Sequence, residues 1–502
     1  MAKEKTTANI GFEKQIWDTA CILRGNMDAG EYKHIILGLI FLKYISDKFE
    51  EKYNALVDEG EGFEDDMDEY TAENIFFVPA SARWDVISQA AHTPEIGMVI
   101  DNAMGEIEKT NPKQLKDVLP KNFARPELDK RRLGDIVDIF TNIKMIDHHD
   151  EKDVLGRTYE YCLSQFAAQE GKNAGEFYTP SCVVRTIVEV LQPFDGIVYD
   201  PCCGSGGMFV QSFDFIRQHS GNINQVSIYG QDANPTTRKL ARMNLAIRGI
   251  EANLGKYAAD TFFDDQHPQL KAGYIMANPP FNLSNWGAGK LMDDVRFQYG
   301  LPPEGNANYA WIQHMIHHLA PHGKMGMVLA NGSLSSQTGG EGEIRKNLVN
   351  ADLIDCIIAM PTQLFYSTQI PVSLWFITKG KKQAGKSLFI DARNMGAMID
   401  RRNRELTEAD IEKIAQTVSQ FEQGVLEDVK GYCAVVDTAD IAKQDYILTP
   451  GRYVGIEEQA DDGEPFDEKM KRLTGELGEL FEQSHGLEQE IRKNLEAIGY
   501  GV

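Results

Sequence analysis

The segment IVYDPCCGSGGMFV, residues 197–210, decides the fold. Asp200 ends a short apolar run that is typical of a strand. Three glycines, Gly204, Gly206 and Gly207, follow before a helical pattern begins, and such glycines let the backbone approach a ligand closely. The spacing fails the G-x-G-x-x-G dinucleotide pattern, and the loop has no lysine for a P-loop. The loop therefore favours a small zwitterionic nucleoside, with Asp200 as a hydrogen-bond acceptor for its ammonium group, over an ordinary glycine-rich turn.

Around this loop, short apolar runs alternate with helical patterns. This alternation predicts βαβ units, a mostly parallel sheet and an α/β fold class. The predicted strands are 197–200, 226–231, 274–277, 325–330, 354–359 and 374–378, and the predicted helices are 207–219, 235–248, 308–319 and 343–349.

Both ends of the chain are predicted to be helical. Apolar residues recur at three-to-four spacing in 32–56, and further helical stretches cover 96–109 and 133–146. Residues 465–498 carry a heptad seam, which favours pairing with a partner helix over packing on the chain's own domain. We therefore expect a helical N-terminal domain (1–170), a central α/β domain (171–400), a connecting region (401–464) and a C-terminal helix that docks a partner (465–502).

Composition excludes several classes of protein. Of the 502 residues, 42% are hydrophobic and 25% are charged, as in ordinary globular proteins. No apolar run reaches the ~18 residues of a membrane span, and the first residues do not read as a signal peptide. The seven cysteines form no C-x-x-C pair, so we expect no disulfide framework and no metal site, and a cytoplasmic location. The net charge of −24 argues against strong nucleic-acid binding by this chain alone.

One basic stretch stands out on this acidic chain. Residues 379–404 hold eight Lys and Arg against two Asp, which indicates either a solvated face or a contact with phosphates. Within it, GKKQAGKS (380–387) matches the P-loop pattern, but the apolar run 388–390 follows where a P-loop needs a helix. We predict a basic turn between two strands.

Two acidic residues follow predicted strands downstream of the glycine loop. Asp232, in GQDAN, is placed to accept hydrogen bonds from both hydroxyls of a ribose. The alternative is that Asp232 or Asn234 caps the helix that begins near Pro235. Asp260, in KYAADTFFDD (256–265), is placed to accept a hydrogen bond from an adenine amine.

The segment AGYIMANPPFN (272–282) carries the chemistry. An aromatic amine is a poor nucleophile because its lone pair is delocalised into the ring. The side-chain carbonyl of Asn278 and the backbone carbonyl of Pro279 can each accept one of its N–H bonds, which aims the lone pair at an electrophile. The two prolines hold these acceptors rigidly, and Phe281 offers a face for an extracted base. The alternative is a plain Pro-Pro strand terminator.

The segment NAGEFYTP (173–180) precedes the glycine loop. Its two rings and Thr179 could close over one end of the ligand. Thr179 could equally be an N-cap with Pro180 at the first helical position, and both roles can hold together.

DPCCGSGG, GQDAN, AADTF and NPPF, in this order and spacing, resemble the S-adenosylmethionine-dependent amino-methyltransferases. GEFYTP just before the loop resembles the methylation (modification) subunit of type I restriction–modification systems, and the resemblance extends over the chain. It implies a Rossmann-like methyltransferase core with a helical N-terminal domain and a helical C-terminal tail. NPPF alone also occurs in ribosomal-RNA guanine and protein-glutamine methyltransferases, but the order with the cofactor loop first resembles enzymes that methylate adenine N6 in DNA.

The resemblance implies S-adenosylmethionine as cofactor and a role for each matched residue. The acid after the second strand is often Glu in this family, so the shorter Asp232 puts the cofactor affinity in doubt. The implied cofactor-binding residues are Glu176, Phe177, Tyr178, Thr179, Pro180, Ser181, Asp200, Gly204, Ser205, Gly206, Gly207, Asp232 and Asp260, and the implied catalytic residues are Asn278, Pro279, Pro280 and Phe281.

The resemblance also implies partners. DNA would be the substrate, a separate specificity subunit would read its sequence for two copies of this chain, and a restriction subunit would supply translocation. The acidic charge and the heptad seam agree with such a complex. The alternatives are an RNA or protein-glutamine methyltransferase, or a catalytically inactive DNA-binding or assembly subunit.

Overall fold

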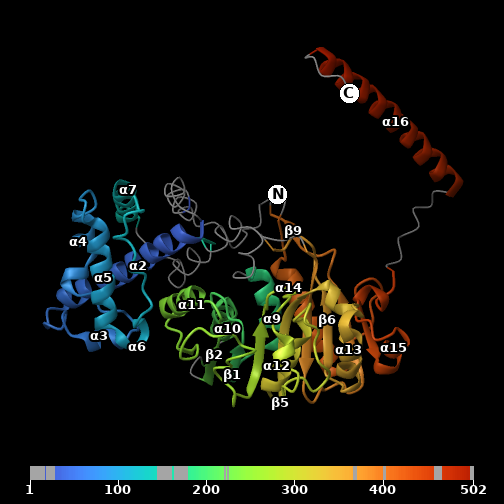
Figure 1. Cartoon of the computed structure of the whole chain (residues 1–502), viewed down its shortest axis with the longest axis horizontal. Coiled ribbons are helices and arrows are strands. Elements are labelled where there is room, and N and C mark those ends of the chain that lie inside the picture. Colours follow the sequence, from blue (N-terminus) through green and yellow to red (C-terminus); the bar gives the residue numbers. More distant parts are fainter. Residues whose placement is uncertain are drawn as a thin grey trace. The chain divides into compact units, whose positions relative to one another are not determined.

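The computed structural model describes Trp17 and residues 29–143, 161–162, 179–219, 222, 225–365, 370–399, 403–456 and 466–497. Two compact units divide the chain, Met1–Gly455 and Ile456–Val502, and each is described by itself (Figure 1).

The described N-terminal residues are helical, and they share one apolar core with Leu240 and Met243 of the later helix at 235–247. The longest of these N-terminal helices, at 29–59, buries the residues of the predicted three-to-four pattern, which are Ile35, Leu39, Leu42, Ile45 and Phe49. The helix predicted at 133–146 begins three residues earlier, and its last three predicted residues lie outside the described ones. The helices are α2 (Ala29–Glu59), α3 (Met67–Thr71), α4 (Trp84–Gln89), α5 (Ile96–Thr110), α6 (Pro112–Leu115), α7 (Lys130–Thr141) and the short 3-10 turn η2 (Ala80–Ala82).

A mixed sheet forms the centre of the first unit. Its strands are β1 (Gly196–Asp200), β2 (Val226–Gly230), β3 (Ala252–Asn253), β4 (Ala272–Ala277), β5 (Leu319–Ala330), β6 (Ile354–Ala359), β7 (Val372–Thr378), β8 (Lys386–Asp391) and β11 (Cys433–Asp437). Their order is β11-β8-β6-β7-β5-β4-β1-β2-β3. β7 runs antiparallel between β5 and β6, and β11 runs antiparallel to β8, while the other neighbours are parallel. The predicted α/β fold is confirmed.

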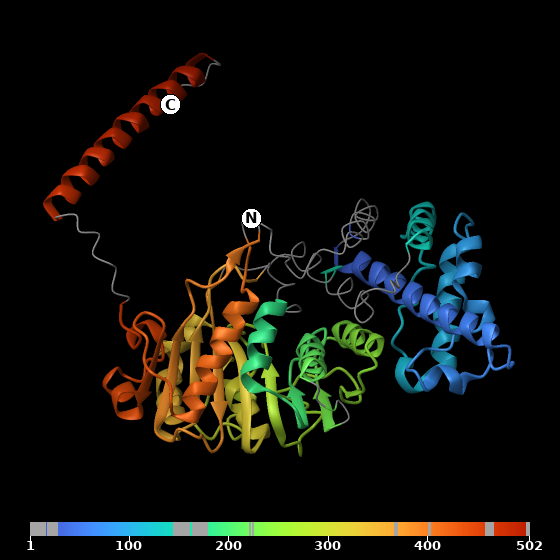
Figure 2. The same cartoon turned by 180° about the vertical axis from the view of Figure 1, so that it is seen from behind.

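Successive strand residues point to opposite faces of the sheet, as the period of a strand requires. In β4, Ile275 and Ala277 join one core cluster and Met276 joins the other, and Trp375 and Phe376 of β7 divide in the same way. The first face is covered by α12 (Asn308–His318), α13 (Glu341–Asn350) and α15 (Thr438–Lys443), and the second by α9 (Ser181–Leu191), α10 (Gly207–Gln218), α11 (Pro235–Ile247) and α14 (Glu408–Gln423) (Figures 1 and 2).

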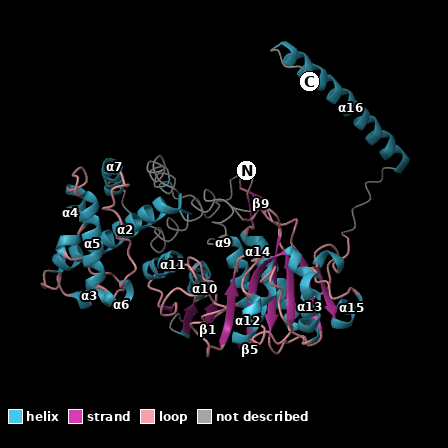
Figure 3. Ribbon diagram, in the orientation of Figure 1, coloured by secondary structure: helices cyan, strands magenta, loops and turns pink. Residues whose placement is uncertain are grey.

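The segment 401–464, expected to be a connecting region, adds elements to this core. β11 extends the sheet, and α14 packs beside α9 on its face (Figures 2 and 3). A small hairpin of β9 (Ala397–Met398) and β10 (Arg404–Glu405) and the 3-10 turns η5 (Ala288–Lys290), η6 (Asn331–Leu334), η7 (Thr338–Gly340) and η8 (Pro450–Arg452) complete the unit.

The basic stretch is largely paired within the fold. Lys381 lies 2.7 Å from Asp352, and Lys382 lies 2.6 Å from Glu422. Residues 379–385 connect β7 to β8, which begins at Lys386, so the predicted basic turn between two strands is confirmed, and a strand rather than a helix follows it.

The second unit contains one helix, α16 (Phe466–Ala497), among its described residues. Its apolar seam residues are 43% to 61% exposed, and they are Met470, Leu473, Leu477, Leu480, Leu487 and Ile491. The predicted C-terminal helix is therefore present with its apolar seam uncovered. No helix in the described part of the chain has the length and apolar character to cross a membrane.

Candidate active site

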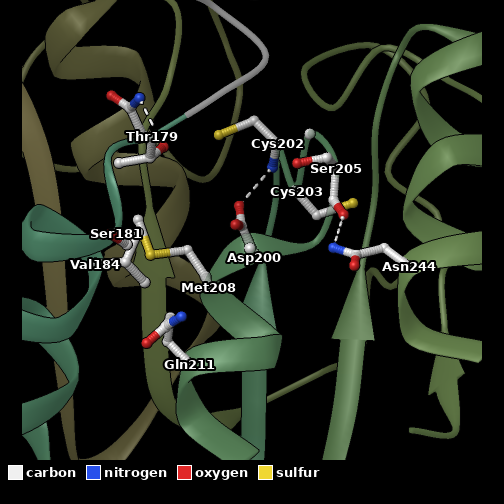
Figure 4. A pocket seen from close by; sticks show the side chains of 13 residues that line it. Thr179, Ser181, Val184, Asp200, Cys202, Cys203, Ser205, Met208, Gln211 and Asn244 are labelled. Atoms are coloured by element: carbon white, nitrogen blue, oxygen red, sulfur yellow. Dashed lines mark hydrogen bonds between the residues drawn. The ribbon is translucent and has the colours of Figure 1, made fainter. Parts of the chain in front are cut away.

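A pocket opens where β1 and β4 end and α9 and α10 begin (Figure 4). Its empty volume is about 540 Å³. The glycine loop and the Asn-Pro-Pro-Phe segment, which are separate in sequence, both contribute to its wall. The lining residues are Thr179, Ser181, Val184, Asp200, Cys202, Cys203, Gly204, Ser205, Gly207, Met208, Gln211, Asn244 and Asn278.

Hydrogen bonds hold the glycine loop to the ends of two strands. The Cys202 N–H donates to Asp200 Oδ1 at 2.9 Å, and the Cys203 N–H donates to the Gln231 carbonyl at 2.9 Å. Gly206 has a φ of 80° at the start of α10, a left-handed conformation that favours glycine. The loop is thereby fixed, with backbone N–H groups at the N-terminus of a helix.

Asp232 belongs to the loop rather than to the helix that follows. Its carboxylate accepts the N–H of Gly204 at 3.1 Å and the N–H of Asn234 at 2.8 Å. The N-cap of α11 is Asn234, which accepts the N–H groups of Thr236 and Thr237. Asn234, and not Asp232, therefore caps the helix. The half-buried Asp232 lies at the edge of the glycine loop.

The two carboxyl groups lie in a desolvated place. Burial raises the pKa of Asp200 to about 8, against the opposing effect of the hydrogen bonds from Cys202. Burial also raises the pKa of Asp232 to about 6, despite the N–H groups of Asn234 and Gly204. A bound cation near Asp200 would favour its ionised form.

Two thiols belong to the same loop. Cys203 is buried and Cys202 is partly buried. Burial raises the pKa of both thiols well above the usual value, and the charges of Asp200 and Asp232 act in the same direction.

Asn278 follows β4 and lies against the pocket. Its Nδ2 donates to Thr179 Oγ1 at 3.0 Å, and its Oδ1 is buried with no hydrogen-bond partner among the described residues. Pro279 is buried, and the half-buried Phe281 meets Phe365 edge to face with 5.8 Å between ring centroids. The Asn278 amide therefore presents an unsatisfied carbonyl oxygen.

Thr179 does not cap a helix. α9 begins at Ser181 with Pro180 as its N-cap residue, and no side-chain hydrogen bond caps it. The prediction of a Thr179 cap with Pro180 at the first helical position is wrong by one residue, and the hydroxyl bonds to Asn278 instead.

The structure does not bring every predicted residue to this pocket. Asp260 is exposed, is absent from the pocket lining, and accepts the N–H of Phe262 at 2.8 Å. Its loop is nevertheless tied to the site, because the Ala259 N–H donates to the Asp232 carbonyl at 3.1 Å. Glu176, Phe177 and Tyr178 lie outside the described residues, and Pro280 is half-buried.

Sequence reasoning missed Asn244. This buried residue of α11 donates from Nδ2 to the Ser205 carbonyl at 2.9 Å and so anchors the loop from behind. A polar residue on the apolar face of a predicted helix, between Ala241 and Leu245, was the available signal.

A histidine cluster lies behind the site. A carboxylate oxygen of Asp265 and one ring nitrogen each from His314 and His318 all lie within 4.8 Å of one another. Both ring nitrogens of His318 face acceptors, the Asp265 carboxylate at 2.8 Å and the Leu270 carbonyl at 3.0 Å. The guanidinium of Arg296 donates to His314 Nδ1 at 3.1 Å. These lone pairs and donors are engaged with one another, so the cluster is a hydrogen-bond network rather than a set of metal ligands.

The Asp265 carboxyl is held ionised by this network. Burial alone would raise its pKa, but the hydrogen bonds from His318 and from the backbone of His267 lower it to about 2. Burial holds the pKa of His314 well below the usual value.

The fold and the pocket together define a class of protein. A glycine loop follows β1, an acid follows β2, and Asn-Pro-Pro-Phe follows β4. The sheet has one antiparallel strand inserted beside β5. These features define a Rossmann-like methyltransferase.

Comparisons with known proteins identify the family. A model of the N-6 DNA Methylase family matches residues 150–462, and a model of the HsdM N-terminal domain matches residues 12–140. The type I restriction enzyme HindI methylase subunit of Haemophilus influenzae is 48% identical over 444 residues, which cover 84% of this chain and 100% of that protein. The MjaIX methylase subunit of Methanocaldococcus jannaschii is 41% identical, over 97% of this chain and 92% of its own length.

A solved structure agrees with these relatives. The type I restriction–modification methyltransferase subunit from Streptococcus thermophilus matches with a TM-score of 0.74 and 26% identity, over 88% of this chain and 99% of that one. The chain belongs to the methylase subunits of type I restriction–modification systems.

Proposed function

We propose that this methylase subunit transfers the methyl group of S-adenosylmethionine to the N6 amine of an adenine flipped out of duplex DNA. The observation that carries the proposal is the buried Oδ1 of Asn278 on the wall of the pocket, for which the described part of the chain offers no hydrogen-bond partner. An unsatisfied buried acceptor is unfavourable by about 1–3 kcal/mol. An amine N–H placed against it removes that penalty, which favours an amine as the substrate group.

The pocket fits the cofactor. S-adenosylmethionine supplies an electrophilic methyl group on a sulfonium, and it carries an ammonium group and a ribose. Asp200 would contact the ammonium group and Asp232 the ribose hydroxyls, and both carboxyls are desolvated. The loop from Gly204 to Gly207 and the segment from Glu176 to Ser181 would hold the methionine portion, and Asp260 would contact the adenine ring.

The chain's own contribution to the step is positioning. Flipping the adenine is unfavourable by a few kcal/mol, and Phe281 and Pro280 would hold the extracted base. Asn278 Oδ1 and the Pro279 carbonyl accept the two amine N–H bonds. The nitrogen lone pair forms the new N–C bond while the C–S pair leaves with the sulfur, and the amine then loses one proton to water. Positioning of this kind can supply about 7–11 kcal/mol.

We further propose that the chain acts within a complex. Its acidic charge of −24 disfavours DNA binding alone, so a specificity subunit would supply sequence recognition for two copies of this chain. The exposed seam of α16 is the surface for that subunit's helices. A restriction subunit with translocase activity would join the complete complex. The cytoplasmic location stays a prediction.

The test is methyl transfer by the subunit co-expressed with its specificity partner. Labelled S-adenosylmethionine is incubated with unmethylated DNA, with RNA and with protein. We expect label in DNA as N6-methyladenine, no label after Asn278→Ala, and nearly unchanged cofactor affinity in that variant. The exposed Asn142→Ala is the matched control and should retain full activity. Label in RNA or protein, or full activity of Asn278→Ala, would overturn the proposal.

A further inference from the structure

We infer that Asn308 is a positioning residue for the target base: it fixes the turn that directly follows Phe281 and so holds the Asn-Pro-Pro-Phe segment in place. This inference rests on the proposed function. It gives a part in methyl transfer to a residue of α12 that does not line the pocket itself.

The turn after Phe281 has an unusual backbone conformation. Asn282 has a φ of 53°, in the left-handed region that residues other than glycine rarely adopt and that asparagine tolerates better than most. Asn282 is exposed, so burial of its own side chain does not hold this conformation. Hydrogen bonds to its backbone and side chain are the contacts that can hold it.

Asn308 makes these hydrogen bonds as a closed pair. The N–H of Asn282 donates to Asn308 Oδ1 at 3.2 Å, and Asn308 Nδ2 donates to Asn282 Oδ1 at 3.0 Å. A backbone N–H and an NH₂ group can only donate, and a carbonyl oxygen can only accept. The backbone N–H therefore sets the orientation of the Asn308 amide, and that amide in turn sets the orientation of the Asn282 side chain.

Burial makes this pair costly to break. Asn308 is 0% exposed, and an amide without partners is unfavourable at such a position. Asn308 is the first residue of α12, but the N-cap residue is Ala307 and no side-chain hydrogen bond caps the helix. The Asn308 amide therefore serves the turn at Asn282 and not the helix that contains it.

The same contacts close the base of the loop that runs from Asn282 to Asn308. The N–H of Ala307 donates to the Leu283 carbonyl at 2.9 Å, beside the Asn282–Asn308 pair. Phe281 comes directly before this closed base, so a fixed turn at Asn282 limits where the Phe281 ring can lie. That ring is the one proposed to hold the extracted adenine.

The test compares two buried amides of the same helix. Gln313 is also 0% exposed, and it accepts the Tyr299 N–H at 2.8 Å and donates to the Gly300 carbonyl at 2.8 Å. For Asn308→Ala, in complex with the specificity subunit, we expect kcat/KM for DNA to fall about tenfold, the scale of two hydrogen bonds. The Kd for S-adenosylmethionine should change by less than about twofold. Gln313→Ala should lower the melting temperature as well but keep kcat/KM within about twofold.

A spectroscopic measurement separates positioning from stability. 2-Aminopurine replaces the target adenine in a duplex that the parent complex methylates, and its fluorescence rises when the base leaves the stack. All variants are measured below their melting transitions. We expect a smaller rise on binding for Asn308→Ala than for the parent, and a rise equal to that of the parent for Gln313→Ala.

Asn282→Gly is a second variant, because glycine adopts the left-handed φ without strain and the exposed position opens no cavity. It should lower kcat/KM about fivefold, and the double variant with Asn308→Ala should lose less than the product of the two single losses, since both act through one turn. If Asn308→Ala does not fold, Asn282→Gly alone is decisive, and its full activity would overturn the inference.

Two further results would also overturn it: equal losses of kcat/KM in Asn308→Ala and Gln313→Ala, or a double variant that loses the full product. The proposed function fails separately. A parent complex that methylates no DNA would reject that function, whereas an active parent beside a fully active Asn308→Ala would reject this inference alone.

Discussion

At the scale of single residues, the site keeps a carboxyl group almost completely buried. Asp200 is 2% exposed, and its pKa of about 8 lies far above the ordinary value of 3.8. The unfolded chain releases this proton near pH 4, whereas the folded chain holds it until about pH 8. Folding therefore loses stability from this group as the pH rises through that window.

We predict that Asp200→Asn removes this loss. The unfolding free energy of the ligand-free variant should exceed that of the parent at pH 8 and differ less at pH 5, while its affinity for S-adenosylmethionine falls. Denaturant unfolding at the two pH values measures the first effect and calorimetry the second. The exposed Asp85→Asn should show neither change, and an equal gain at both pH values would contradict the prediction.

Sequence patterns predicted only those parts of the site that a single short segment of sequence determines. Asp200, Asp232 and Asn278 each follow a strand, and strand ends of a parallel sheet gather at one edge, so their grouping could be predicted. The bond from Asn278 to Thr179 spans 99 positions and depends on how α9 packs, which no local pattern encodes. The anchoring of the loop by Asn244 was missed for the same reason.

At the scale of elements, one buried arginine connects two functional loops. Arg296 lies in the segment between Asn-Pro-Pro-Phe and α12, and its guanidinium donates to the carbonyls of Thr261 and Phe262. Asp294 Oδ2 lies 2.6 Å from Nη2 of this guanidinium and balances its charge. Because Thr261 and Phe262 directly follow Asp260, the loop proposed for the cofactor's adenine is braced by the segment after the proposed target site.

We predict that Arg296→Met destabilises the protein by about 1–3 kcal/mol, because the partly buried Asp294 loses its charge partner and the carbonyls of Thr261 and Phe262 lose a hydrogen-bond donor. Cofactor affinity should fall more than kcat does. Arg296→Lys should recover part of the stability but not the forked contact with both carbonyls. Thermal melting and calorimetry measure these effects, with the exposed Arg131→Met as control. A variant with unchanged cofactor affinity would show that the brace is not needed for binding.

Element prediction succeeded for the inner strands and was weaker at the edge. Ile354–Ala359 was predicted with its observed bounds, because a strand buried on both faces is a continuous apolar run. The antiparallel direction of β7 cannot be read from its residues, since the same apolar run serves either direction. β11 has only five residues, and their burial does not alternate, so its sequence signal is weak. Its place beside β8 is set by tertiary contacts.

At the scale of the whole molecule, the second unit offers a separable surface. The seam of α16 leaves Leu477 49% exposed and Leu480 59% exposed. Burial of a leucine side chain stabilises an association by about 1.5–3 kcal/mol, so a seam of this length can hold a partner helix.

We predict that Leu477→Glu combined with Leu480→Glu abolishes co-purification with the specificity subunit. Cofactor affinity and melting temperature should remain unchanged, because the first unit does not include these residues. Gln489→Glu, on the polar side of the same helix, is the matched charge control and should still assemble. Retained assembly of the double variant would place the partner surface elsewhere.

The two thiols of the glycine loop have a chemical consequence. A methyl donor is an alkylating agent, and a thiolate is a far better target for alkylation than a nucleobase amine. Because burial keeps Cys202 and Cys203 protonated, neither sulfur competes for the methyl group that their own loop would hold. The protonated thiols would be poor targets for the proposed methyl donor, and we expect a polar substitution that hydrates this loop to make them more reactive towards alkylating agents.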